Sequence, residues 1–114
     1  MRDYALIFHP GPSLDPSDLP RRNAAAREWA LALGRDGTLQ VASPLEDAGF
    51  QVSRQGVVPV SRASAIASVL IVKARHLDEA VGLAQGHPGL AFGTMIEVRP
   101  IKAVAPASSS SSGR

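Results

Sequence analysis

The chain has 114 residues, of which 45% are hydrophobic, with no cysteine and a formal net charge of +2. This length fits one small domain that would gain stability from a partner subunit, and the lack of cysteine excludes disulfides, thiolate metal ligands and cysteine nucleophiles. The charge and aromatic content are too low to favour nucleic-acid binding, no apolar run approaches the roughly 20 residues of a membrane span, and the first residues lack a signal-peptide pattern, so we expect a cytoplasmic protein.

The first half of the chain predicts a strand, a helix and a second strand. Residues 4–8 (YALIF) are apolar at every position and predict a buried strand, which the prolines and glycine of residues 10–12 end. Residues 21–33 are rich in alanine, leucine and arginine and predict a helix with Ser17 or Asp18 as its N-cap. Trp29 lies on the apolar stripe of this helix. Residues 38–42 predict the second strand.

The second half begins with the weakest pattern of the chain, over residues 45–65. Within it, residues 50–53 and 57–60 predict a loose hairpin about a turn at 54–56. Residues 66–74 are dense in valine, leucine and isoleucine and predict a strand. A short helix follows, with Asp78 and Glu79 in its first turn, and residues 86–89 (GHPG) end it. Residues 92–101 predict the last strand, which completes a domain of residues 1–102. We expect the serine-rich tail, residues 103–114, to be disordered.

This order of elements predicts an α+β fold with a ferredoxin-like antiparallel sheet and two helices on one face. The strands are apolar on both faces, so we expect a second copy of the sheet to cover the face without helices, which gives a homodimer. Within the sheet, we expect the first strand to run parallel to strand 66–74 and antiparallel to the last strand. His9, Lys73 and residues 87–94 would then lie at one end of the sheet.

Two histidines at this end are candidates for chemistry. His9 and His87 approach each other in the predicted topology, and imidazoles that titrate near neutrality can exchange protons with a ligand. The alternative interpretation is that both are solvated turn residues.

Arg99, Trp29 and Lys73 are the candidate ligand-binding residues. Arg99 shares a face of the last strand with Glu97, where it can hold a carboxylate or enolate; alternatively, the two charges pair with each other or with a partner subunit. Trp29 is either a core residue or part of a pocket wall. Three scattered histidines lack metal-ligand spacing and there is no phosphate-binding glycine motif, so we expect neither a metal nor a cofactor.

The order and spacing of four segments resemble those of the YCII-related (YciI-like, DGPF) proteins. These segments are residues 4–8, 37–44 (GTLQVASP), 77–80 (LDEA) and 97–101 (EVRPI), and the resemblance extends over about residues 3–102. It implies a dimeric α+β barrel. The family's proposed acid–base pair is a helix histidine, whose place falls near Ala26, and an aspartate, whose place falls at His87. Of the family's Asp-Gly-Pro-Phe turn, only Gly56 and Pro59 match.

Two hypotheses therefore remain open for the function. In the first, the chain is a small dimer that binds a small organic molecule and performs cofactor-independent acid–base chemistry, with His9, His87 and Arg99 as the working residues. In the second, it is a non-catalytic accessory or dimerisation module. A cavity that holds both histidines would favour the first hypothesis, and a filled interior would favour the second.

Overall fold

The computed structural model describes residues 1–10, 16–61 and 66–102, so the predicted serine-rich tail lies outside the described residues. In chain order the elements are β1 (Arg2–His9), the 3-10 helix η1 (Pro16–Asp18), α1 (Leu19–Arg35), β2 (Leu39–Pro44), β3 (Phe50–Ser53), β4 (Gly56–Pro59), β5 (Ser68–Ala74), α2 (Leu77–Gln85), the 3-10 helix η3 (Pro88–Phe92) and β6 (Met95–Pro100). Each strand and helix expected from the sequence is present, with shifted ends.

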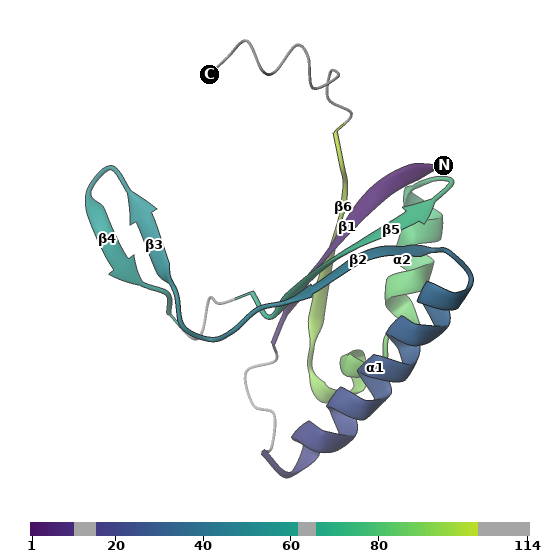
Figure 1. The fold of residues 1–114 in the computed structure, drawn as a ribbon, viewed down its shortest axis with the longest axis horizontal. Helices are drawn as coiled ribbons and strands as arrows, with labels where there is room; N and C mark the ends of the chain where they lie inside the picture. The colour runs from purple at the N-terminus through teal and green to yellow at the C-terminus, as the bar shows by residue number, and fades with distance from the viewer. Residues whose placement is uncertain (11–15, 62–65, 103–114) are drawn as a thin grey trace.

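The four longer strands form one antiparallel sheet in the order β2-β5-β1-β6, and both helices lie on one face of it (Figure 1). The predicted ferredoxin-like α+β fold is therefore confirmed. One part of the topology prediction was wrong, because β1 runs antiparallel to β5. The reason is that β5 lies between β1 and β2 and runs antiparallel to both. β1 and β2, which are not neighbours, therefore run in the same direction.

The core lies between the sheet and the helices. Tyr4, Leu6 and Phe8 of β1 are buried on this side, because alternate side chains of a strand point to opposite faces. Residues of β5 and α2 complete the core: Leu70, Val72, Ala74, Ala80 and Ala84. The full burial of a side chain such as Leu6 stabilises the fold by roughly 1.5–3 kcal/mol.

The opposite face of the sheet, here called the open face, carries no helix among the described residues (Figure 1). Its centre is apolar and half-exposed, because Ile7 of β1 lies beside Val69 of β5. Towards the sheet edges, Val41 of β2 is 45% exposed and Met95 of β6 is 64% exposed. The second apolar face that the strand composition predicted is thus present, and no helix in the described part of the chain covers it.

The two helices differ in how closely they pack on the sheet. α2 buries Ala80 and Ala84, and His76 caps it by accepting a hydrogen bond from the Glu79 backbone N–H at 3.2 Å. No residue of α1 is fully buried, although Trp29 packs against the core. α1 therefore rests on the sheet through partly buried side chains and leaves space beneath it.

The last strand begins later than predicted, because residues 88–92 form the 3-10 helix η3. Pro88 occupies its first turn, where the missing N–H of proline costs nothing. Gly93 ends it with φ of +88°, a left-handed conformation that favours glycine. Phe92 of η3 lies under the guanidinium of Arg21 on α1, 5.4 Å from the ring centroid, so η3 is tied to the start of α1.

The predicted hairpin is also present, with β3 paired to β4 as a separate two-stranded sheet. It projects away from the helices and the main sheet (Figure 1). No helix of the described residues is long and apolar enough to cross a membrane.

Candidate functional site

The space beneath α1 is a pocket of about 490 Å³ between the helix and the covered face of the sheet. This volume lies within the usual range for small-molecule sites. Phe8, Leu70 and Trp29 provide large apolar walls, and four alanines widen the pocket by their small size: Ala26, Ala30, Ala42 and Ala67. Six polar side chains also line the pocket: Arg22, Asn23, Arg27, Ser68, His87 and Thr94.

His87 is held in this pocket by its own backbone. It begins η3, and its Nδ1 accepts a hydrogen bond from the Gly89 backbone N–H at 2.9 Å. Its ring meets Phe8 and Trp29 edge to face, with centroid separations of 4.7 Å in both cases. Only 8% of the residue is exposed. The prediction that His87 is a solvated turn residue is therefore wrong, because η3 folds the turn back under α1.

The hydrogen bond to Nδ1 fixes the tautomer of His87. Since Nδ1 accepts a hydrogen bond from the Gly89 N–H, it carries no proton, and we assign the ring proton to Nε2. Nε2 has no hydrogen-bond partner within residues 1–10, 16–61 and 66–102. In these residues, every side-chain nitrogen or oxygen that is sealed from solvent has a hydrogen-bond partner, so Nε2 is not sealed. Nε2–H is therefore accessible, and because the ring lines the pocket, it is available there to an acceptor on a ligand.

Burial keeps this imidazole neutral. Desolvation, with a smaller contribution from the nearby positive charge of Arg22, lowers the pKa of His87 from its ordinary 6.5 to about 4. At neutral pH the group is therefore a hydrogen-bond donor through Nε2, and it carries no charge.

Two guanidinium groups from α1 make the pocket electropositive. Arg22 lies at its wall and donates to the side-chain Oδ1 of Asn23 from both Nε and Nη2, at 3.3 and 3.0 Å. Arg27 also lines it and has neither a hydrogen-bond nor an ion-pair partner in the part of the chain that the structure describes. Arginine stays charged at any physiological pH. The pocket thus combines aromatic walls with uncompensated positive charge, which suits a planar anion.

Of the predicted site residues, the structure brings Trp29 and His87 together in this pocket and separates His9 from them. His9 and Phe8 are adjacent in β1 and so point to opposite faces of the sheet, and Phe8 contacts His87. The expectation that His9 and His87 approach each other is therefore wrong. The two positions where the family resemblance places an acid–base pair, Ala26 and His87, both line the pocket.

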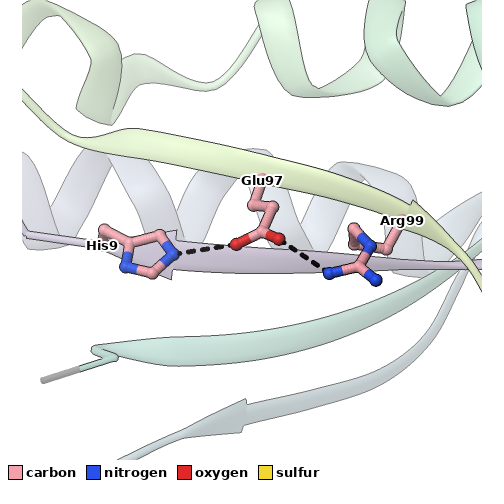
Figure 2. Close-up of polar contacts among 3 residues, drawn as sticks. All are labelled: His9, Glu97 and Arg99. Carbon is pink, nitrogen blue, oxygen red and sulfur yellow. Dashed lines mark hydrogen bonds and ion pairs between the residues drawn. The ribbon is translucent and has the colours of Figure 1, made fainter.

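His9 and Arg99 belong to a second group on the open face. The Glu97 carboxylate lies between them, with Oε1 3.2 Å from His9 Nε2 and Oε2 accepting from Arg99 Nη1 at 2.9 Å. Figure 2 shows this arrangement, with His9 supplied by β1 and the other two residues by β6. The Arg99 hydrogen bond, and then that of His9, hold the pKa of Glu97 below its usual 4.5. Arg99 is thus occupied by a carboxylate of its own chain.

Lys73 lies at the other end of the sheet. It is in register with Asp3 at the start of β1, and its Nζ donates to the Asp3 carboxylate at 3.0 Å. The placement of Lys73 beside His9 was wrong for the same reason as the parallel pairing, namely that β5 runs opposite to β1. Lys73 is not among the described residues that line the pocket beneath α1.

Sequence reasoning missed the arginines and Asn23 of the pocket. Arg22 precedes Ala26 by four residues and Trp29 by seven, so the three share one face of a helix. That spacing was a usable signal, but an arginine beside an apolar stripe is more often a solvated flank. Thr94 gave no signal, because its place depends on the return of the chain after η3.

The fold and the site together define a small α+β protein with a ligand-sized pocket between helix and sheet. A solved structure of this fold is that of 5-chloro-2-hydroxyhydroquinone dehydrochlorinase from Burkholderia phenoliruptrix AC1100, in complex with 2,5-dihydroxybenzoquinone. The two chains are 22% identical, with a TM-score of 0.54 over 89% of this chain and 95% of the other. No protein-family model and no curated protein matches the sequence. The likeness shows a shared fold.

Proposed function

We propose that this chain is a homodimeric protein of the YCII-related type that binds a small planar anion in the pocket beneath α1, without a cofactor. The observation that carries the proposal is that Arg22, Arg27 and His87 line one pocket, which is walled by Phe8 and Trp29. An apolar cavity with a few convergent polar groups is the usual form of a small-molecule site.

Each group has a distinct part in binding. The arginines attract the negative charge, and a guanidinium can form two parallel hydrogen bonds with a carboxylate or a pair of ring oxygens. His87 donates one hydrogen bond through Nε2 and orients the ligand. The edge-to-face rings of Phe8 and Trp29 leave flat apolar surfaces against which a planar ring can lie.

The ligand class follows from this chemistry and from the structural neighbour. The bound molecule of that neighbour, 2,5-dihydroxybenzoquinone, is a flat ring with acidic hydroxyl groups, and a ring of this size fits within about 490 Å³. We propose that this protein accepts an acidic hydroxylated ring of the same class.

We favour a role in ligand binding over a role in which His87 performs acid–base catalysis. A side chain transfers protons best when its pKa lies near the working pH, and burial holds the pKa of His87 near 4. The position of the family's helix histidine is Ala26, which has no proton to exchange. These two observations also favour the second candidate, a non-catalytic accessory or dimerisation module.

The proposed homodimer rests on the open face. Ile7, Val69 and Ile71 form an apolar strip there that no helix among the described residues covers, and a second copy of the same face is complementary to it by symmetry. We propose that residues 1–102 form the domain that dimerises in the cytoplasm.

Isothermal titration calorimetry with 2,5-dihydroxybenzoquinone as the probe tests the proposed site. We expect saturable binding, and a loss of about tenfold or more in affinity for Arg22→Gln, because a charge-assisted hydrogen bond is typically worth ~1.5–3 kcal/mol. Arg35→Gln is the matched control, since Arg35 lies on the same helix and does not line this pocket. An absence of binding by the wild type, or equal losses in the two variants, would contradict the proposal.

A further inference from the structure

The hairpin β3–β4 has one face made only of apolar side chains. Phe50 is paired with Pro59 and Val52 with Val57, and residues directly opposite each other in an antiparallel pair share a face. The other face carries Gln51, Ser53 and Val58. Phe50, Val52 and Val57 are 68%, 78% and 61% exposed, so the apolar face is uncovered within the protomer.

This hairpin stands apart from the rest of the chain. Figure 1 shows it extending away from the main sheet, beyond the end of β2. Its root is anchored by two backbone hydrogen bonds, Val60 N–H to the Gly49 carbonyl and Leu45 N–H to the Ala67 carbonyl, both at 2.9 Å. A two-stranded hairpin on its own is marginally stable in water. An apolar ribbon of this kind therefore needs a surface to pack on.

The charges along the hairpin indicate what that surface is. Arg54 lies in the turn at its tip, and Glu46 lines a hollow of about 390 Å³ at its root, together with Leu45, Phe50 and Ile66. Neither charged side chain has a hydrogen-bond or ion-pair partner among the described residues. When two copies of the hairpin lie antiparallel about a two-fold axis, the tip of each copy meets the root of the other. Arg54 of each copy then faces the hollow that Glu46 of the other copy lines, so the contact is made twice.

We propose that the hairpin is an arm that packs its apolar face on a second copy of this chain, with Arg54 seated against Glu46 of that copy. The strands of the arm have four residues each, about 13 Å in length, so the arms alone fall short of the roughly 800 Å² per partner of a stable interface. The arms therefore extend the interface of the open face, from which β2 leads directly into the root of the hairpin. The inference thus rests on the proposed homodimer and deepens it.

Sedimentation equilibrium over a range of protein concentrations tests the arm. Val52→Lys places a charge on the apolar face, and we expect it to raise the dimer dissociation constant by about tenfold or more. Val58→Lys is the matched control, because Val58 is 55% exposed on the other face of the same hairpin, and we expect no change. Circular dichroism of each variant establishes that the protein is folded.

A charge-reversal cycle tests the pairing of tip and root. Arg54→Glu and Glu46→Arg should each weaken the dimer, and the double variant should recover most of the loss, because the two charges are exchanged. Losses that simply add would overturn the contact between Arg54 and Glu46.

A further variant separates this inference from the homodimer itself. Ile71→Lys charges the open face and should yield a monomer if the sheets pair. If Ile71→Lys is monomeric while Val52→Lys dimerises like the wild type, the arm is wrong and the sheet pairing stands. A wild type that stays monomeric at all concentrations would overturn both.

Discussion

The indole of Trp29 and the imidazole of His87 meet edge to face in the pocket, with ring centroids 4.7 Å apart and ring planes inclined by 74°. Trp29 is the only tryptophan of the chain. A protonated imidazole quenches indole fluorescence more strongly than a neutral one, and a bound quinone also quenches it. The fluorescence of the protein therefore reports on the candidate site directly.

The first prediction concerns stability and pH. The pKa of His87 is lowered to about 4 in the folded protein, so between pH 6.5 and 4 the unfolded chain binds a proton that the folded chain does not. Stability must then fall as the pH drops through this window, by a total on the order of 2–3 kcal/mol. Urea unfolding monitored through Trp29 between pH 8 and 5 measures the upper part of the loss.

His87→Asn is the control for this measurement. Its side-chain oxygen can still accept from the Gly89 N–H, as asparagine does at helix N-caps, but it does not titrate. We expect the free energy of unfolding of this variant to depend less on pH than that of the wild type. His9 and His76 are present in both proteins, so they do not cause the difference. Identical pH profiles would show that another group is responsible.

The second prediction concerns Gly89, whose lack of a side chain leaves room for the imidazole of His87. A Cβ at this position would lie 2.8 Å from both Cε1 and Nδ1 of His87 and 3.0 Å from Thr94 Oγ1. Gly89→Ala should therefore displace the ring, weaken binding of the probe and lower stability by about 1–3 kcal/mol. Gly82→Ala on α2 meets nothing within 4 Å and should raise stability by about 0.5–1 kcal/mol, because alanine favours a helix. Thermal unfolding of both variants checks the contrast.

The third prediction concerns the group on the open face. Glu97→Gln removes the ion pair with Arg99 and the partner of His9, so we expect a lower melting temperature at neutral pH. Because these partners hold the pKa of Glu97 below 4.5, the advantage of the wild type is complete above that pH and is lost as the pH falls below it. A difference between the two proteins that persists at pH 3 would argue against the ion pair as the cause.

The fourth prediction compares neighbours on the two faces of β1. Leu6 is fully buried under the helices, so Leu6→Ala should lower stability by about 2–5 kcal/mol at any protein concentration. Ile7 points to the open face, and the cost of Ile7→Ala should increase with concentration if a second copy covers this face. Chemical unfolding at dilute and concentrated protein distinguishes the two cases. An unchanged cost for Ile7→Ala would mean that the face stays open in solution.

Local sequence patterns were sufficient for most of the fold. The valine- and leucine-rich runs located β1 and β5, and even the weak segment at residues 50–60 yielded the hairpin, since its turn and apolar residues are local features. The direction of β5 was misjudged because it depends on the path between β2 and β5, where sequence patterning is poor. That one error moved Lys73 to the wrong end of the sheet.

The candidate site was only partly predictable, for a similar reason. Trp29 and His87 were selected as individual residues, but their contact depends on η3 folding under α1, a tertiary arrangement that no local pattern encodes. His9 was assigned to the same site because it lies at the same end of the sheet. The prediction did not consider to which face of the sheet its side chain points. Strand alternation, with Phe8 buried, places His9 on the other side.

The alanines that line the pocket have one more consequence. Ala26, Ala30, Ala42 and Ala67 present only methyl groups to the cavity, and none of them belongs to the buried core. Ala67 packs against the core from its edge, so Ala26, Ala30 and Ala42 are the positions where a larger side chain would fill the pocket without displacing a core residue. This wall is therefore where natural variation or protein engineering can change the size and shape of the pocket while the buried core is left intact.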